Sequence, residues 1–402
     1  MKEVVIVDAV RTPIGRYNGS LKNIRPDDLG AVVIKAIVER NPQVDPREIE
    51  EVVFGNANQA GEDNRNVARM SALLAGLPVE VAATTINRLC GSGLDSVNYA
   101  ARAIAVGEGD IFIAGGTESM TRAPFVMAKP TKDFPRGNME MFDTTIGWRF
   151  INNQLAEMYG TDSMPQTAEN VAKQYNLSRE EQDYFAYQSQ LKARDAMESG
   201  RLNDEIVPVS YKDRKGNEVV VEMDEHPRPE TTVETLAKLK PLFKDGTVTA
   251  GNASGVNDGA SALLLMSADK AKELGIKPLA SYVVSATAGL EPSIMGIGPI
   301  FATRKALERA GLSTSDLDLI ELNEAFASQS LACMRDLELD AVKVNVNGGA
   351  IAFGHPLGAS GARILTTLIY EMKRRSSTYG LATMCVGVGQ GIATIVKNID
   401  SK

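Results

Sequence analysis

The sequence contains little histidine, little cysteine and no long apolar run. Its 402 residues include only two histidines, three cysteines and one tryptophan. Cys90, Cys333 and Cys385 are odd in number and widely spaced, which argues against a disulfide framework. No apolar run approaches the ~18 residues that a membrane helix requires. We therefore expect neither a disulfide-rich scaffold nor a membrane protein.

Basic segments and targeting signals are also scarce. The formal net charge is −8, and neither half carries a basic stretch dense enough to follow a phosphate backbone. We expect no nucleic-acid partner. The N-terminal stretch MKEVVIVDAVRTP has the pattern of a strand entering a turn, without the apolar core and cleavage site of a signal peptide. Together with the unpaired cysteines, this predicts a cytoplasmic protein.

Short β-branched runs alternate with amphipathic helices, which predicts an α/β sheet protein of two or three compact units. Two distant parts of the chain share one order of elements. A predicted helix followed by a strand occurs twice, at 27–40 with 50–59 and at 302–313 with 316–329. A strand, a turn of small residues, a helix and another strand then follow at 84–116 and at 343–391. We interpret these as one βαβ-rich unit used twice, with the halves packed about a pseudo-twofold axis.

A different kind of sequence separates the halves. It holds several prolines and a helix-rich block at 168–200, and it reads as an insertion in the first half. The apolar strand at 247–266 would then return to complete the first sheet. The predicted domains are a first half at 1–121 plus 246–270, an inserted loop domain at 122–245 and a second half at 271–402.

Cys90 lies where a predicted strand ends and a helix begins. A thiol at a helix N-terminus is close to the positive end of the helix dipole, which favours the thiolate. Gly91 and Gly93 leave the approach to the sulfur open. These features favour a nucleophile over a buried structural cysteine.

His355 occupies the matching turn of the second unit, between Gly354 and Pro356. If the halves pair about a pseudo-twofold axis, the imidazole comes close to the Cys90 thiol. A structural histidine is the alternative. The other histidine, His226, lies in the acidic stretch DEHPRP, where we expect it to be solvated.

Three further residues have candidate roles. Cys385 ends what we expect to be the last strand, before the glycines of VGVGQG, whose backbone N–H groups would suit an oxyanion site; a core cysteine is the alternative. Asn323 follows a strand and either caps the next helix or holds a water. Cys333 has no such setting, and we expect it to be a packing residue.

Five motifs in order along the chain resemble the thiolase family: NRLCGSGL, GNASGVNDGA, NEAF, NGGAIAFGHPLGASGAR and CVGVGQG. The resemblance covers essentially the whole chain. It implies a thiolase fold, with five αβαβα layers and an inserted loop domain. It also implies a ping-pong Claisen reaction on coenzyme A thioesters, with no cofactor and no metal, in a homotetramer or homodimer.

The resemblance also implies roles for single residues. Cys90 would be acylated, His355 would take its proton, and Cys385 would be the acid/base at the α-carbon of the acetyl unit. Asn323 would position a water that forms one oxyanion hole with His355, and the N–H groups of Cys90 and Gly387 would form the other. The residues implied to bind substrate or coenzyme A are Met164, Arg228, Phe243, Ser254, Met295, Ala325 and Phe326.

One motif departs from the family pattern, because Val388 stands where many members have glycine. With GEDNRNVARM and DTTIGWRF, this variant resembles the branch that acts on 3-oxoadipyl-CoA in aromatic-compound breakdown. Fatty-acid β-oxidation and biosynthetic acetoacetyl-CoA formation remain alternatives. Arg149 either meets a substrate carboxylate or forms a structural salt bridge.

Two other classes share the expected architecture. A β-ketoacyl synthase often needs two histidines beside its cysteine, and His226 would have to be the second. A noncatalytic lipid or thioester carrier would not need Cys90, His355, Asn323 and Cys385 together. A dinucleotide-binding enzyme is disfavoured, since no GxGxxG follows the first strand.

Overall fold

The strands of the two halves pair in the same order in the computed structural model, which describes residues 1–400. The first half runs β4 (Ala82–Ile86), β3 (Glu51–Gly55), β5 (Ile111–Ser119), β10 (Asn257–Ser267) and β1 (Val4–Arg11). The second runs β12 (Leu319–Leu322), β13 (Tyr379–Val386), β14 (Gln390–Asn398) and β11 (Ala280–Gly289). The parallel pairs lie at the outer edges: β4 with β3 and β3 with β5 in the first half, and β12 with β13 in the second. The other pairs within each half are antiparallel. The predicted duplication is confirmed.

The halves meet at β1 and β11, which pair through Val5 with Ser281 and Ile6 with Ala280. One continuous β-sheet therefore runs through both halves. The returning strand β10 pairs with β1 and β5, as predicted.

Two predictions about strands in the second half are wrong. The expected counterpart of β4 is reduced to a single bridge between Val344 and Ile320, followed by the short helix α11 (Ala350–Phe353). Cys385 does not lie on the last strand, because the chain turns back after Val386 and forms β14 beside β13. The side chains at 391–396 of β14 are buried, so this strand is covered on both faces.

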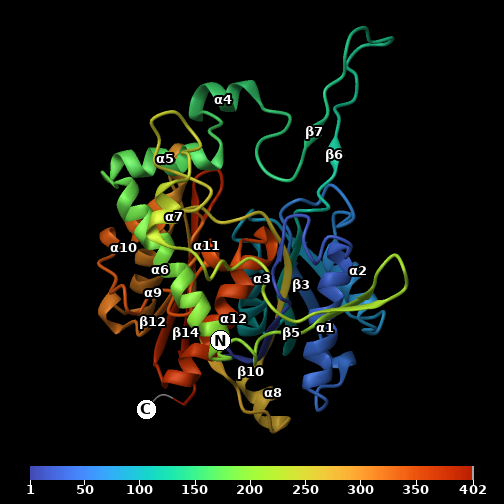
Figure 1. Ribbon diagram of the computed structural model, residues 1–402. Helices are drawn as coiled ribbons and strands as arrows, with labels where there is room; N and C mark the ends of the chain where they lie inside the picture. Colours follow the sequence, from blue (N-terminus) through green and yellow to red (C-terminus); the bar gives the residue numbers. More distant parts are fainter. Residues whose placement is uncertain (401–402) are drawn as a thin grey trace.

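Helices cover the strands in layers (Figure 1). Helices α3 (Ser92–Val106) and α12 (Leu357–Arg375) pack against each other and against strands of both halves. Helices α1 (Pro26–Arg40) and α2 (Val67–Leu74) cover the outer face of the first half, and α9 (Gly298–Ala310) and α10 (Ala327–Asp336) that of the second. Alternate strand residues belong to different cores: Val53 faces α3 and α12, whereas Val52 and Phe54 face α1 and α2. The five layers are those predicted.

Glycines allow the two central helices to approach closely. A Cβ atom on Gly93 of α3 would lie 2.6 Å from the carbonyl oxygen of Gly358, and one on Gly361 of α12 would lie 2.3 Å from the nitrogen of Leu94. Only a residue without a side chain fits at either position. The turns that precede these helices, one carrying Cys90 and the other His355, are thereby held side by side.

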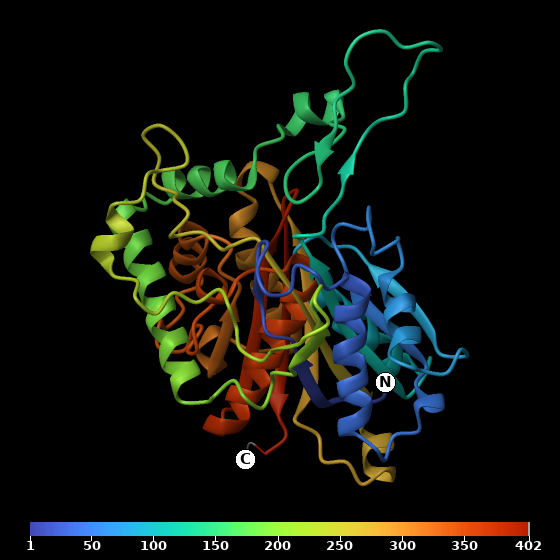
Figure 2. The same ribbon diagram turned by 45° about the vertical axis from the view of Figure 1, so that its right-hand side comes forward.

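The inserted region contributes the remaining large elements. Its helices and strands are β6 (Phe125–Val126), β7 (Phe142–Asp143), α4 (Asn153–Tyr159), α5 (Met164–Gln174), α6 (Arg179–Glu198), β8 (Val209–Lys212), β9 (Glu218–Val221) and α7 (Val233–Ala237). The hairpin of β6 and β7 projects from the body in Figures 1 and 2. Shorter elements complete the chain: β2 (Gly15–Arg16), α8 (Ala268–Glu273) and 3-10 turns at Pro46–Glu48, Pro292–Ile297 and Thr314–Asp316. The domain boundaries themselves stay a prediction.

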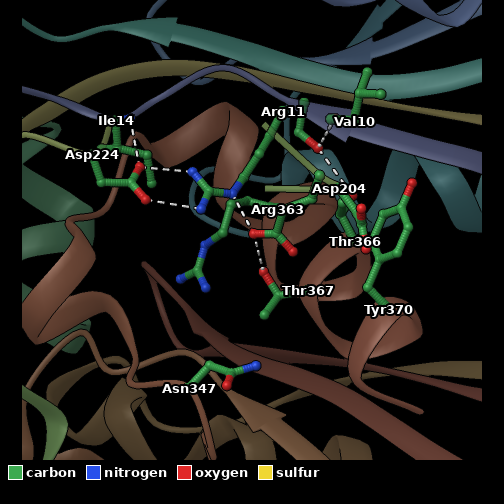
Figure 3. Close-up of polar contacts among 12 residues, drawn as sticks. Val10, Arg11, Ile14, Asp204, Asp224, Asn347, Arg363, Thr366, Thr367 and Tyr370 are labelled. Atoms are coloured by element: carbon green, nitrogen blue, oxygen red, sulfur yellow. Dashed lines mark hydrogen bonds and ion pairs between the residues drawn. The ribbon is translucent and has the colours of Figure 1, made fainter. Parts of the chain in front are cut away.

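A buried ion cluster ties the inserted region to the first strand. Arg11 at the end of β1 pairs with Glu205 at 2.5 Å and with Asp224 at 2.7 Å, and all three side chains are at most 2% exposed. Figure 3 shows the guanidinium of Arg11 facing Asp224. Although burial opposes the charge, the two carboxylates raise the pKa of Arg11 above its ordinary value. Glu205 also accepts a hydrogen bond from Thr367 of α12.

Candidate active site

The turn before α3 presents Cys90 to two adjoining cavities. Cys90 is partly exposed, and it lines both cavities. Leu89, directly before it, has a φ of 46°, a left-handed conformation that is uncommon for a residue with a side chain. The backbone N–H groups of Gly387 and of Cys90 itself lie close enough to the sulfur to favour its thiolate form and lower the pKa of the thiol. Both N–H groups of the predicted oxyanion site therefore lie near the thiol.

The protonation state of Cys90 differs from our expectation. Burial raises the pKa of the thiol to about 11, while the N–H groups of Gly387 and Cys90 act in the opposite direction. Removal from water therefore outweighs the helix dipole, and the resting group is a neutral thiol. Its activation requires a base.

His355 supplies a candidate base from the turn before α12. The side chain is 5% exposed and lines the same cavity as Cys90. Its Nδ1 lies 2.6 Å from Oγ of Ser360, and that hydroxyl donates to the carbonyl of Pro356 at 2.9 Å. The hydroxyl proton is thus occupied, so Nδ1–H must be the donor to Ser360 and Nε2 must carry the lone pair.

The unprotonated Nε2 of His355 is buried and has no hydrogen-bond partner in the described chain. Burial lowers the pKa of His355 to about 3, and Arg363 acts in the same direction. The imidazole is therefore neutral near pH 7. A neutral imidazole with a free nitrogen can accept a proton from a thiol.

Asn323 is a second buried group left without partners. Neither its side-chain oxygen nor its nitrogen has a hydrogen-bond partner within residues 1–400. Helix α10 begins after Phe326 and has no side-chain cap, so the capping alternative for Asn323 is wrong. Its backbone N–H donates to Thr383, two residues before Cys385. A buried amide with both ends free is suited to holding a water.

Cys385 is buried beside the wall of the first cavity. It packs with Met295 and Ala325, and with Met164 and Phe326 at the edge of the same cluster. Burial raises the pKa of its thiol well above the ordinary value, and the nearby Cys90 acts in the same direction. Cys385 is therefore a neutral thiol close to Cys90. Cys333 packs in the outer core of the second half, as expected.

His226 is not solvated, contrary to our expectation. It lines the first cavity, and burial followed by the charges of Arg228 and Arg16 lowers its pKa to about 4. Its Nδ1 lies 3.2 Å from the side-chain nitrogen of Asn257. We expected solvent exposure because acidic residues flank His226 in the sequence. One of them, Asp224, is instead buried in an ion pair with Arg11.

The first cavity has a volume of about 550 Å³ and collects most of the predicted coenzyme A residues. Its lining includes Met164, Arg228, Ser254, Met295, Ala325 and Phe326, together with Cys90 and His355. Phe243 is the exception, since it lines a separate depression beside Glu169 and Gly246. Phe243 follows Pro241 and Leu242 in an exposed loop, and no local pattern indicates which cavity such a loop residue lines.

Two residues of this site were absent from the sequence predictions. Asn257 accepts the backbone N–H of His355 at 2.9 Å, and Ser360 orients its ring. The position of Ser360 in the first turn of the predicted helix was the available signal. For Asn257 there was none, because it comes from the returning strand 98 residues away.

Comparison with known proteins agrees with this geometry. Residues 4–269 match the family model described as "Thiolase, N-terminal domain", and residues 276–398 match "Thiolase, C-terminal domain". The chain belongs to the thiolase family. It is therefore an acyltransferase enzyme, and the β-ketoacyl synthase and carrier alternatives are set aside.

Individual thiolases resemble the chain over its whole length. It is 58% identical to the 3-oxoadipyl-CoA/3-oxo-5,6-dehydrosuberyl-CoA thiolase of Escherichia coli (strain K12), over 99% of this chain and 100% of that protein. It is 56% identical to a beta-ketoadipyl-CoA thiolase of Acinetobacter baylyi, with the same coverage. The crystal structure of the Bacillus anthracis acetyl-CoA acetyltransferase has a TM-score of 0.94 at 44% identity, covering 99% of both chains.

Residues 1–400 lack two kinds of feature. They hold no helix long and apolar enough to cross a membrane. Nor do they contain a group of three or more His, Cys, Asp or Glu side chains placed to bind a metal ion.

Proposed function

We propose that this thiolase cleaves 3-oxoadipyl-CoA with coenzyme A, giving succinyl-CoA and acetyl-CoA through an acyl-enzyme on Cys90. The observation that carries the proposal is the convergence of a thiol, two N–H donors and a free imidazole nitrogen beside two cavities. The substrate comes from the names of the 56–58% identical relatives.

In the first half-reaction His355 Nε2 takes the Cys90 proton, and the thiolate attacks the 3-oxo carbon. The tetrahedral oxyanion is assigned to the N–H groups of Cys90 and Gly387, which lie near enough to the sulfur to lower its pKa. The bond between C2 and C3 then breaks. The electron pair leaves with the acetyl-CoA part as an enolate, and the succinyl group stays on Cys90.

Protonation of the enolate is assigned to Cys385. Its raised pKa keeps the proton on sulfur until the carbanion forms. The enolate oxygen is stabilised by protonated His355 and by a water on the free amide of Asn323. In the second half-reaction the Cys385 thiolate takes the proton of coenzyme A, whose thiolate takes the succinyl group from Cys90. Protonated His355 then returns its proton to the Cys90 sulfur.

The first cavity is assigned to coenzyme A, whose anionic phosphates would meet Arg228 at its lining. The reaction calls on no cofactor other than this substrate. Biosynthetic acetyl-CoA acetylation is the second candidate, since the Bacillus anthracis neighbour carries that name.

Steady-state thiolysis distinguishes these candidates. The assay compares 3-oxoadipyl-CoA, 3-oxohexanoyl-CoA and acetoacetyl-CoA at saturating coenzyme A. We expect kcat/KM to be highest for 3-oxoadipyl-CoA, by tenfold or more. A higher value for acetoacetyl-CoA would favour the acetyltransferase and overturn the assignment.

We further propose a homotetramer held by the hairpin at 122–151. Its exposed apolar side chains include Met127, Phe134, Met141 and Phe150, and Phe134 is 95% exposed. A projecting apolar segment of this kind marks a protein interface. Light scattering should give four chains for the native protein and fewer for Phe134→Ser/Met141→Ser. A native monomer would refute it.

The site of action is proposed to be the cytoplasm. All three cysteines are free thiols, two of them with proposed catalytic roles, and such thiols persist in a reducing compartment. Cell fractionation tests this, with recovery of the activity in a membrane or periplasmic fraction as the contrary result.

A further inference from the structure

The second cavity is suited to the acyl chain of the substrate. It has a volume of about 440 Å³ and lies against the inserted segment at 144–149. Five residues line both cavities: Cys90, Met120, Ile146, Met164 and Leu357. A thioester bound at Cys90 needs its coenzyme A arm on one side of the sulfur and its acyl chain on the other. With coenzyme A in the first cavity, the second remains for the acyl chain.

One basic side chain lines this second cavity. Arg149 is half-buried, and its Nη2 donates a hydrogen bond to the carbonyl of Asn58 at 3.3 Å. It makes no ion pair within residues 1–400. By contrast Arg122, at the start of the same insertion, pairs with Glu62. The structural salt bridge considered for Arg149 from the sequence is therefore not formed.

The acidic side chains around the cavity are already engaged elsewhere. Glu118 accepts the backbone N–H groups of Ala57, Asn58 and Gly358. Asp162 accepts a hydrogen bond from Asn170 at 2.8 Å. The cation of Arg149 is thus left without an acidic partner in the wall of a cavity that the nucleophile also lines.

Val388 shapes the apolar part of the same cavity. It has a φ of 59°, a strained conformation for a β-branched residue, and it lines the cavity beside Gly387. Strain of this kind persists where a side chain serves a function. The isopropyl group forms part of the wall next to Gly387, where methylene carbons of a short acyl chain would lie.

We infer that Arg149 binds the terminal carboxylate of a dicarboxylic 3-oxoacyl-CoA and so determines acyl specificity; the inference rests on the proposed function. A guanidinium presents two parallel N–H groups that match a carboxylate. With the acyl carbon on Cys90, Val388 contacts the methylenes and Arg149 receives the distal charge. A monocarboxylic chain of equal length ends in a methyl group, which leaves Arg149 unpaired.

The test compares two substrates that differ only in that end group, 3-oxoadipyl-CoA and 3-oxohexanoyl-CoA. Arg149→Met should lower kcat/KM for 3-oxoadipyl-CoA about 10- to 100-fold, the effect of losing a charged hydrogen bond. The value for 3-oxohexanoyl-CoA should stay within about threefold. Arg149→Lys keeps the charge without the planar fork, and should lose less. Arg214→Met, an exposed position of the inserted region outside the hairpin at 122–151, is the matched control and should match the native enzyme with both substrates.

The outcomes separate the two proposals. If the native enzyme does not prefer 3-oxoadipyl-CoA, the proposed function fails and the inference fails with it. If the native enzyme has the preference and Arg149→Met retains it, the inference alone is overturned. An equal loss with both substrates would also overturn it, since that pattern indicates a general binding or structural role. Should Arg149→Met fail to fold, the substrate ratio of Arg149→Lys decides.

Discussion

Two arginines at the start of the chain make ion pairs with neighbouring acidic residues of the inserted region. Arg11 pairs with Asp224 and Glu205, all at most 2% exposed. Arg16 pairs with Glu225 at 3.2 Å, and its side chain is 54% exposed. The two substitutions Arg11→Met and Arg16→Met therefore remove similar contacts in opposite environments.

The expected losses of stability follow from burial. Arg11→Met leaves two buried carboxylates without their ion-pair partner, and removing one partner of a buried ion pair costs about 3–5 kcal/mol. Arg16→Met breaks a pair that water screens, at a cost of about 0–1 kcal/mol. Adding Asp224→Asn to Arg11→Met removes one of the stranded charges and should recover part of the loss.

Urea unfolding followed by circular dichroism measures these differences. If Arg11→Met lies within 1 kcal/mol of Arg16→Met, the cluster in Figure 3 does not anchor the insertion as described. A second readout is enzymatic. The anchored segment leads directly to His226 and Arg228 in the first cavity, so Arg11→Met should also raise the KM for coenzyme A.

Three further substitutions test the site. Cys385→Ser should still be acylated on Cys90 but lose most of its carbon–carbon bond formation from acetyl-CoA. Full condensation turnover by this variant would refute the acid/base role of Cys385. Ser360→Ala removes the hydroxyl that accepts a hydrogen bond from His355 and orients its ring, so kcat should fall about 10- to 100-fold while KM changes little. Ser360→Thr keeps a hydroxyl and should restore kcat. An unchanged kcat in Ser360→Ala would refute the tautomer assigned to His355. Gly93→Ala forces α3 and α12 apart and should lower the free energy of unfolding by about 1–3 kcal/mol, with loss of much of the activity. A Cβ atom on Gly289 would have its nearest neighbour 3.9 Å away, so Gly289→Ala should have neither effect. Equal effects of the two substitutions would refute the close packing of α3 and α12.

The internal repeat made the central arrangement predictable. Matching helix and strand patterns in the two halves indicated that the turns with Cys90 and His355 would meet, and the close contacts of Gly93 and Gly361 provide the physical reason. The exception was the second-half strand around Val344. Its pattern favours a strand, but only one residue pairs with β12.

Properties that depend on long-range burial were not predictable. The local sequence of Cys90 indicated a lowered pKa, yet the layers packed around it remove water and raise the pKa to about 11. His226 lies among acidic residues in sequence but faces a cavity in space. The tautomer of His355 depends on a hydrogen-bond chain through Ser360 to Pro356 that no spacing rule reveals.

The most direct test of the account is mass spectrometry of the enzyme mixed with succinyl-CoA and freed of unbound thioester. We predict one succinyl group per chain, located on the peptide that contains Cys90, and none on Cys90→Ala. Succinylation at a different residue, or full thiolysis by Cys90→Ala, would contradict it.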